Sequence, residues 1–220
     1  MSDHIFAGRH YRNRVHAGRI LADHVERCRE SGRVVVLALP RGGVPVARQV
    51  AEHLDVPLDV FLVRKVGVPD QPELAAGAIA SGGVVVLNDE VIKGTGITDS
   101  EWNALVHDET AELERRADIY RGACEPVDIS GATVIIVDDG IATGATMRAA
   151  VRALRQLGPA AVAVAVPVGP PGVEQQFPEA DRVICPTVVE SFRGVCAAYD
   201  DYEPLSDAEV RDMLSHPRCR

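Results

Sequence analysis

Short hydrophobic runs alternate along the chain with longer segments in which hydrophobic residues recur every three or four positions. The runs predict strands that are buried on both faces, at residues 34–39, 58–63, 133–137, 161–166 and 182–185. The periodic segments predict helices at residues 12–30, 44–54, 99–121, 145–157 and 206–215. Strands that alternate with helices predict an α/β fold, in which a mainly parallel sheet carries helices on both faces.

The segment after the second predicted strand departs from this alternation. Residues 64–72 are rich in Pro and Gly and predict a loop, while residues 75–80 and 84–87 predict a hairpin that turns at 81–83. The sequence has no internal repeat and no low-complexity tract. A chain of 220 residues with 46% hydrophobic composition can build one core, so we expect residues 1–220 to form a single domain.

Two carboxylates follow the third predicted strand, in the stretch VIIVDDGIATGATM at residues 134–147. Burying one unpaired carboxylate inside a sheet would cost several kcal/mol. We therefore expect Asp138 and Asp139 at the carboxyl end of the strand, where they face water, a cation or a ligand. In open α/β sheets, that edge is where ligands bind.

The residues after the two carboxylates can hold a phosphate. Gly144 allows backbone angles that a side chain would forbid, and Thr143 and Thr146 supply hydroxyls. The start of the predicted helix offers N–H groups that favour a phosphate. A phosphate site a few residues from two carboxylates suits a ligand such as ribose 5-phosphate, which carries an anionic end and vicinal hydroxyls. The alternative interpretation is an exposed Asp-Asp turn that only caps a helix.

Composition and charge narrow the class of protein. The formal net charge of −9 argues against nucleic acid or an anionic membrane surface as the main partner. The five cysteines are scattered without a C-x-x-C pair, which favours neither a zinc site nor a disulfide framework. Such cysteine usage is typical of a reducing cytosol. With no signal peptide and no membrane-length apolar segment in the sequence, we expect a cytoplasmic protein.

The order of an apolar strand, two acidic residues and then Thr-Gly-x-Thr resembles the signature of type I phosphoribosyltransferases. Together with LPRGG at 39–43, RKVGVPDQPELAAGAIASGG at 64–83 and FRGVCAAYDDYEPLSDAEV at 192–210, it is most similar to a group of predicted phosphoribosyltransferases whose acceptor is unassigned. The resemblance implies a pentosyltransferase that moves the phosphoribosyl group from phosphoribosyl pyrophosphate to a nitrogen nucleophile of nucleobase-like chemistry and releases pyrophosphate.

The resemblance also assigns roles around the two carboxylates. It implies that Asp138 and Asp139 bind the ribose hydroxyls and Mg²⁺, the cofactor of this chemistry. It implies further that four loop residues hold the 5-phosphate of the donor: Thr143, Gly144, Ala145 and Thr146. The implied partners are phosphoribosyl pyrophosphate and a small-molecule acceptor, with no nucleic acid and no membrane, and the assignment is compatible with a homodimer.

Basic and acidic residues at two further places match parts of the family pattern. Arg41, Gly42 and Gly43 follow the first predicted strand and correspond to the loop that holds pyrophosphate, although the same residues also suit an ordinary turn. Arg64 and Lys65 open the segment 64–83, which in the resembled enzymes begins with a mobile loop that closes over the substrate, although the pair also suits an ordinary surface position. Glu73 is a candidate acid/base group or simply a charge at an element edge.

The C-terminal residues 186–220 match the position of the variable hood of type I enzymes. There an aromatic ring stacks on the acceptor base, and Phe192 or Tyr199 could take that role here. Ordinary packing of either ring is the alternative.

Two departures from the family pattern concern catalysis. Ala142 stands where the 6-oxopurine enzymes carry an aspartate, and Val68 stands where a second loop lysine is usual. These departures favour a rival hypothesis, a non-catalytic protein that senses phosphoribosyl pyrophosphate or a nucleotide. A dinucleotide-binding oxidoreductase is disfavoured, because Pro-Arg-Gly-Gly-Val-Pro after the first strand does not supply G-x-G-x-x-G.

Overall fold

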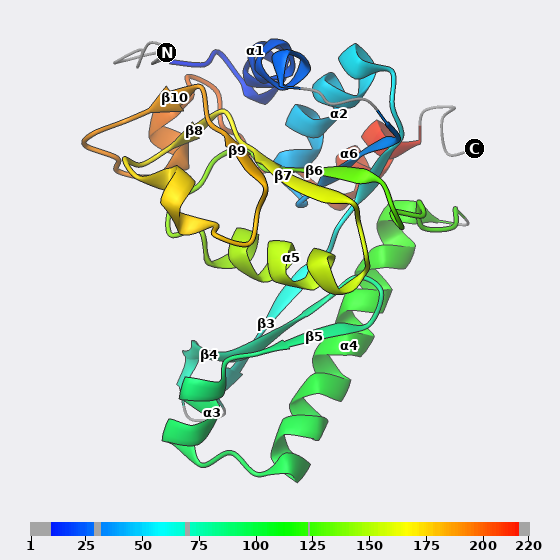
Figure 1. Ribbon diagram of the computed structural model, residues 1–220, viewed down its shortest axis with the longest axis vertical. Helices are drawn as coiled ribbons and strands as arrows, with labels where there is room; N and C mark the ends of the chain where they lie inside the picture. The colour runs from blue at the N-terminus through cyan, green and yellow to red at the C-terminus, as the bar shows by residue number, and fades with distance from the viewer. Residues whose placement is uncertain (1–9, 29–31, 69–70, 123, 216–220) are drawn as a thin grey trace.

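The computed structural model describes residues 10–28, 32–68, 71–122 and 124–215. Its main sheet has five parallel strands in the order β2, β1, β6, β7, β9 (Figure 1). In that order, the strands are Leu58–Val60, Val34–Ala38, Thr133–Val137, Ala161–Ala165 and Arg182–Ile184. The α/β fold with a mainly parallel sheet, predicted from the sequence, is confirmed.

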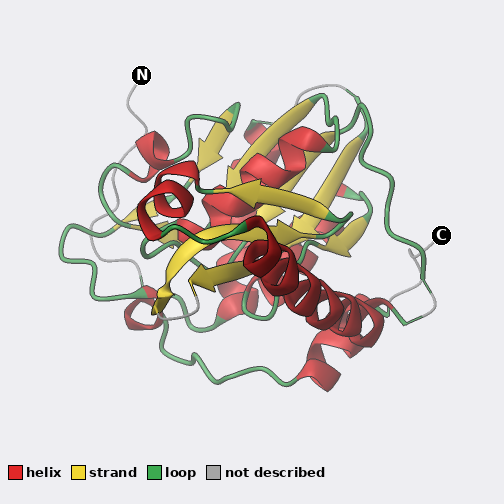
Figure 2. Ribbon diagram, turned by 90° about the horizontal axis from the view of Figure 1, so that it is seen from below, coloured by secondary structure: helices red, strands yellow, loops and turns green. Residues whose placement is uncertain are grey.

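Helices cover both faces of the main sheet (Figures 1 and 2). Helices α1 (Arg14–Arg27) and α2 (Gly43–Leu54) pack on one face, and α5 (Ala145–Gln156) packs on the other. Side chains of successive β1 residues point to opposite faces of the sheet. Val36 packs in the cluster that includes α1 and α2, and Val35 packs in the cluster that includes α5. A strand that is buried on both faces needs an apolar residue at every position, which explains the hydrophobic runs.

A second, antiparallel sheet projects away from the main sheet (Figure 1). It consists of β3 (Val63–Val68), β4 (Gln71–Ala80) and β5 (Val84–Leu87). The short helix α3 (Asp89–Thr95) and the long helix α4 (Asp99–Arg121) follow it in the chain. Helix α4 returns along this smaller sheet to the main sheet, so it connects the projecting part to the edge where β2 ends.

The structure corrects one sequence prediction in this region. Residues 64–72, predicted as a loop, belong mostly to β3 and to the start of β4. Gly67 lies at an irregularity in the pairing of these two strands, and such irregular pairing tolerates the glycine that suggested a loop. The predicted hairpin is confirmed, because β4 and β5 pair through a turn in which Gly82 and Gly83 have φ angles of 83° and 73°. Closure of this segment over a substrate stays a prediction.

Smaller elements complete the chain beyond β6. Strands β8 (Val168–Gly169) and β10 (Thr187–Val188) pair in parallel with each other. Two single turns of 3₁₀ helix lie at Val173–Gln176 and Val195–Ala198. Helix α6 (Asp207–Leu214) confirms the last predicted helix.

The segment before α1 pairs with the C-terminal part of the chain. The N–H of Tyr11 donates to the carbonyl of Ala198, and the N–H of Asp200 donates to the carbonyl of Tyr11, both at 2.8 Å. The buried Tyr11 hydroxyl lies 2.9 Å from the carbonyl of Pro167 and 2.7 Å from the hydroxyl of Thr187. The segment before α1 and residues 198–200 are thereby held together beside the main sheet, and the chain on either side of them contributes to the site described below.

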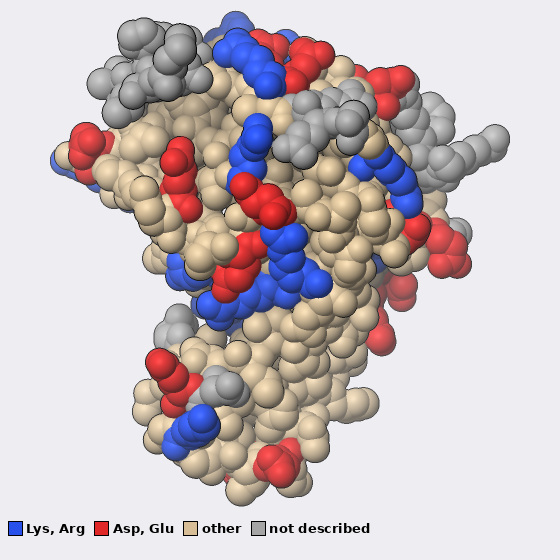
Figure 3. Space-filling view, viewed as in Figure 1, with Lys and Arg blue, Asp and Glu red and all other residues tan. Residues whose placement is uncertain are grey.

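Charged side chains of both signs are mixed over the main-sheet part of the face shown in Figure 3. On this face, the described residues form no continuous basic stripe. Across the described ranges, no helix is both long and apolar enough to span a bilayer.

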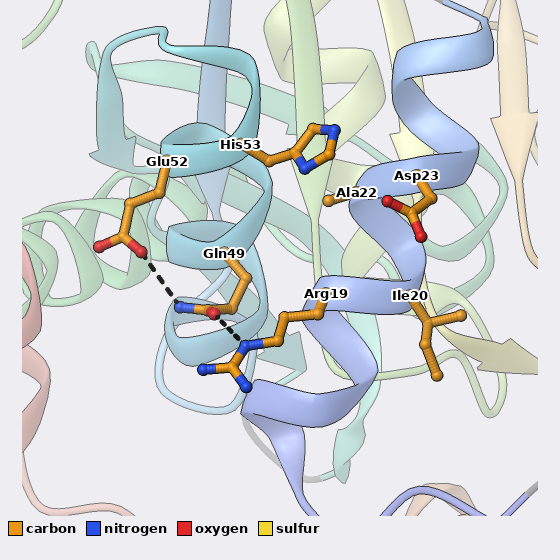
Figure 4. A pocket seen from close by; sticks show the side chains of 7 residues that line it. All are labelled: Arg19, Ile20, Ala22, Asp23, Gln49, Glu52 and His53. Atoms are coloured by element: carbon orange, nitrogen blue, oxygen red, sulfur yellow. Dashed lines mark hydrogen bonds between the residues drawn. The ribbon is translucent and has the colours of Figure 1, made fainter.

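A wide depression of about 450 Å³ lies between α1 and α2 (Figure 4). Its polar side chains bond to one another, since Arg19 Nε donates to Gln49 Oε1 at 3.0 Å and Gln49 Nε2 donates to Glu52 Oε2 at 3.3 Å. His53 Nε2 lies 2.7 Å from Glu26 Oε2 at the rim. Gln49, Glu52 and His53 lie in the later turns of α2, which runs from the carboxyl edge of the sheet towards the opposite edge, so the depression is separate from the site below.

Candidate functional site

Two loops meet at the carboxyl edge of the main sheet. Residues 39–42 lead from β1 into α2, and residues 138–144 lead from β6 into α5. Because β1 and β6 pair with each other, the two loops are neighbours, and the N–H of Leu39 donates to the carbonyl of Val137 at 2.9 Å. The peptide bond between Pro40 and Arg41 is cis. The structure therefore brings together two of the segments that the sequence predicted to form a ligand site.

Asp138 is the first residue after β6 and is partly buried. Its Oδ1 accepts a hydrogen bond of 2.8 Å from the N–H of Asp139. Burial, and next the negative charge of Asp139, raise the pKa of the Asp138 carboxyl well above its usual range. A carboxyl group held in this way favours a cation or a hydroxyl donor as a partner, because either one would stabilise its charged form.

Asp139 is buried, and its carboxylate accepts hydrogen bonds from α1 and from the C-terminal part of the chain. Arg14 Nε donates to its Oδ2 at 2.8 Å, and the Tyr202 hydroxyl donates to the same oxygen at 2.9 Å. The Arg14 guanidinium also lies 3.8 Å above the centre of the Tyr202 ring, and it donates to the carbonyl of Glu203 at 2.8 Å. The sequence prediction placed both carboxylates towards a ligand, but one oxygen of Asp139 faces this internal network.

Arg14 and Tyr202 are functional candidates that sequence reasoning missed. The side chains of Arg14 and Asp139 are only 11% and 9% exposed, so the pair is removed from water. Burial first, and then the nearby Asp139 charge, raise the pKa of Tyr202 to about 12, which keeps its hydroxyl protonated as a donor at neutral pH. Arg14 is 125 positions from Asp139 in sequence, and no local pattern marks that pairing.

Tyr199, Tyr202 and Glu203, from the segment predicted as a hood at 186–220, take part in this network, and the two aromatic candidates in the segment have different roles. Tyr199 is buried, and its hydroxyl donates to the backbone carbonyl of Asp139 at 2.6 Å, so it is not placed to stack on a ligand. Phe192 is partly buried and packs against the buried cluster that includes Tyr11, Ala17 and Tyr199. Of the two rings, only Phe192 remains a candidate for contact with an acceptor.

Gly42 and Gly43 allow the two loops to approach closely. A Cβ at Gly42 would lie 1.9 Å from Asp139 Oδ2, and a Cβ at Gly43 would lie 2.7 Å from the carbonyl oxygen of Val137. Neither space can hold a methyl group without movement of the neighbouring loop. The sequence analysis took both glycines as phosphate-binding positions, and the structure adds a packing requirement for each.

Replacing Gly42 with alanine is expected to destabilise the protein by about 1–3 kcal/mol, because the added methyl overlaps the buried Asp139 carboxylate. Urea unfolding would measure the change. Gly94→Ala is a matched control, because no heavy atom lies within 4 Å of its Cβ position and the residue lies in α3. The control is expected to be neutral or to stabilise by up to about 1 kcal/mol. Equal effects from the two substitutions would contradict the close approach at Gly42.

The phosphate loop is open to solvent at the positions that would contact a ligand. Thr143, Ala145 and Thr146 are exposed, whereas Gly144 is buried with a φ angle of 71°. A side chain at Gly144 would meet Gln176, Arg148 and Phe177, so its glycine is required by both backbone angle and packing. Helix α5 begins at Ala145, and the N–H groups of its first turn lack acceptors within the helix. The loop can therefore bind an anion through backbone groups and hydroxyls.

Three other predicted residues, Arg41, Lys65 and Glu73, lie on different elements. Arg41 is exposed in the first loop, and its guanidinium lies 3.9 Å from the Asp207 carboxylate at the start of α6. Lys65 is exposed on β3, and because strand residues alternate it lies on the opposite face from Arg64, which contacts α4. The side chain of Glu73 lies outside the described part of the structure, so its predicted role stays a prediction.

A small cleft of about 50 Å³ lies between the two loops and the smaller sheet. Leu39 and Pro40 line it from the first loop, Thr146 lines it from α5, and Arg64 and Arg116 line it from β3 and α4. The cleft thus joins both candidate anion-binding loops to basic side chains from the projecting part of the fold. Arg116 is a further residue that sequence reasoning missed.

Comparisons with known proteins show which family the chain resembles. The family model of the phosphoribosyl transferase domain matches residues 12–203. The Mycobacterium tuberculosis protein Rv0571c, whose assignment as a phosphoribosyl transferase is itself provisional, is 46% identical over 200 residues, which are 90% of this chain and 45% of that protein. The chain thus spans about half the length of this relative. The bifunctional protein PyrR of Chloroflexus aurantiacus is 35% identical over 129 residues, covering 57% of this chain and 65% of PyrR.

Solved structures show the same fold. The crystal structure of TT1426 from Thermus thermophilus superposes with a TM-score of 0.83 at 38% identity, over 93% of this chain and 97% of TT1426. With the matched family model, which includes both loops and residues 186–203 of the segment predicted as a hood, these similarities confirm the family resemblance inferred from the sequence. The chain belongs to the phosphoribosyl transferase domain family.

Proposed function

We propose that this protein transfers the phosphoribosyl group from phosphoribosyl pyrophosphate to a nitrogen nucleophile and releases pyrophosphate. The observation that carries the proposal is the juxtaposition at one sheet edge of a carboxylate, Asp138, an exposed phosphate loop at 143–146 and the loop that contains Arg41. A donor with a phosphate at one end, two hydroxyls in the middle and a pyrophosphate at the other end matches that order of groups.

The two aspartates take different roles in the proposed reaction. Asp138 binds a ribose hydroxyl and stabilises the positive charge that develops at the sugar during transfer. Asp139 is held by Arg14 and Tyr202, so it orients the loop through its Oδ2 and offers only its other oxygen to the ribose. Thr143 and Thr146, with the backbone of Gly144 and Ala145, hold the 5-phosphate.

The residues present fit a Mg²⁺ ion that enters with the donor. Mg²⁺ is commonly held by one or two carboxylates together with substrate phosphates and water. Asp138, whose pKa is raised by burial and by the negative charge of Asp139, suits that role, and Asp139 is the second candidate ligand. Across the described ranges, no three His, Cys, Asp or Glu side chains gather around a common metal position, so the remaining ligands would come from the donor. When bound, the ion neutralises pyrophosphate charge and assists its departure.

The acceptor is proposed to bind between the phosphate loop and the hood, where Phe192 offers an aromatic contact. Ala142 is exposed at the position where 6-oxopurine enzymes carry an acid, so this site supplies no carboxylate there. A nucleobase-like small molecule remains the proposed acceptor class. Arg41 is proposed to hold pyrophosphate, and Lys65 joins it only if the hairpin of β3 and β4 moves.

Titration calorimetry with phosphoribosyl pyrophosphate, with and without Mg²⁺, tests the donor. We expect saturable, Mg²⁺-dependent binding with a dissociation constant near micromolar, on the order of −8 kcal/mol. Absence of binding under both conditions would refute the proposed function. With binding established, release of pyrophosphate across a panel of nucleobase-like acceptors tests transfer.

A donor sensor without transferase activity is the second candidate. The observation that favours it is the exposed Ala142 in place of an acid beside the acceptor space. Donor binding without pyrophosphate release for any acceptor in the panel would support the sensor and contradict the enzyme.

A further inference from the structure

Few basic side chains of the family motifs lie near the proposed pyrophosphate position. The usual place of a second loop lysine is taken by Val68, which is buried in β3. Arg64, the neighbouring basic residue on β3, is paired with Glu109 and lies 3.8 Å from Glu112. Among the described basic residues of these motifs, Arg41 alone lies on the pyrophosphate loop, although the ligand carries several negative charges.

Helix α4 brings a further arginine to this place. Arg116 lines the cleft together with Pro40 of the pyrophosphate loop and Thr146 at the start of α5. A ligand that spans the two phosphate-binding loops would pass the mouth of this cleft. The side chain of Arg116 is 46% exposed, so it can turn towards such a ligand without disturbing the core.

A chain of contacts places Arg116 close to Arg41. The Arg41 guanidinium and the Tyr120 hydroxyl share one oxygen of Asp207, at 3.9 Å and 2.7 Å. Arg116 precedes Tyr120 by one turn on the same face of α4, where residues four apart are neighbours. The two arginines thus lie near the same Tyr120–Asp207 pair, Arg41 on the loop after β1 and Arg116 on α4.

The local charge balance leaves capacity for an anion. Glu112 accepts hydrogen bonds from Arg115 at 2.7 Å and from Arg116 at 2.8 Å, and it also lies near Arg64. Among the described contacts Arg116 therefore has no carboxylate to itself, because Arg115 binds the same Glu112 and Arg64 lies near it. An anionic ligand in the cleft would give Arg116 a further partner of opposite charge.

We propose that Arg116 is a pyrophosphate-binding residue, which supplies from α4 the cation that the β3 segment lacks at Val68. The inference rests on the proposed function, since it names a residue that recognises the pyrophosphate half of the same donor. Arg116 acts on the leaving group and does not contact the 5-phosphate, so its removal affects one half of the donor only.

Calorimetry on the purified full chain tests this role with three ligands, each in the presence of Mg²⁺: phosphoribosyl pyrophosphate, inorganic pyrophosphate and ribose 5-phosphate. Arg116→Ala is expected to weaken binding of the two pyrophosphate-containing ligands by about tenfold or more, the effect of losing a hydrogen bond between charged groups. Its binding of ribose 5-phosphate should be unchanged, and Arg116→Lys should retain part of the pyrophosphate affinity.

Arg115→Ala is the matched control, because Arg115 pairs with the same Glu112 from the adjacent position but does not line the cleft. It removes the same charge from the same helix and should bind all three ligands like the wild type. Equal pyrophosphate affinities of Arg116→Ala and Arg115→Ala, with donor binding by the wild type, would overturn the inference and leave the proposed function standing. A wild type that binds none of the ligands would overturn both, and equal loss of all three ligands in Arg116→Ala would overturn the specific role.

Discussion

Asp138→Asn is expected to weaken the binding of phosphoribosyl pyrophosphate with Mg²⁺ by about 10- to 150-fold, the range for losing one hydrogen bond to a charged group. Asparagine keeps the shape of the side chain and can still accept the hydrogen bond from the N–H of Asp139. It cannot supply the negative charge that the ribose hydroxyls and Mg²⁺ require. Calorimetric titration of both proteins with the donor measures the difference. Equal donor affinity would remove Asp138 from the proposed site.

Stability measurements on the same variant separate lost binding from lost folding. Because the pKa of Asp138 is raised in the folded protein, its ionisation favours the unfolded chain as pH increases above the ordinary carboxyl range, about pH 4. The substituted asparagine does not ionise, so the variant should be at least as stable as the wild type at pH 7. Below about pH 4 the aspartate is neutral as well, and the difference should shrink. Urea unfolding at the two pH values checks the sign, and a less stable variant at pH 7 would contradict it.

Arg14→Met is expected to destabilise the protein by about 3–5 kcal/mol, because it leaves the buried Asp139 carboxylate without its cation. For a chain of this size the melting temperature should fall by about 6–20 °C. The thermal melt of the purified variant measures this effect. The expected loss is large because the Asp139 side chain that remains is buried and cannot recover its hydration in the folded state.

Two further variants test whether the loss arises from the buried pair. Arg33→Met breaks an exposed pair with Asp128, whose side chains are 49% and 68% exposed, and should cost less than about 1 kcal/mol. Adding Asp139→Asn to Arg14→Met removes the unpaired charge and should recover part of the stability. If Arg14→Met costs no more than Arg33→Met, Arg14 does not stabilise Asp139 in the way described.

Most of the main sheet could be predicted from the sequence, because its strands are buried on both faces and the helices between them are amphipathic. Residues 133–137 illustrate this, since the predicted and observed strand coincide. The stretch 64–72 could not be predicted in the same way. Its glycine and prolines suggest a loop by local propensity, and only pairing between β3 and β4 makes residues 64–68 and 71–72 parts of strands.

The candidate site could likewise be predicted only in part. Asp138, the phosphate loop at 143–146 and Arg41 could be placed from sequence, because each follows directly after a strand of a parallel sheet and the carboxyl ends of those strands share one edge. Their local order along the chain already encodes their position in space. Residues that reach this edge from elsewhere carry no such signal.

Hydrophobic periodicity and short motifs were enough to specify the α/β fold, the family and the two loops, because in these features chemistry and backbone conformation are contiguous along the chain. The binding of Asp139 by Arg14 and Tyr202, and the position of Arg116 in the cleft beside Pro40, became visible only in the folded chain. Those contacts join residues far apart in the sequence. They depend on how α1, α4 and the C-terminal segment pack against the sheet, and packing of that kind leaves no periodic or local trace in the sequence.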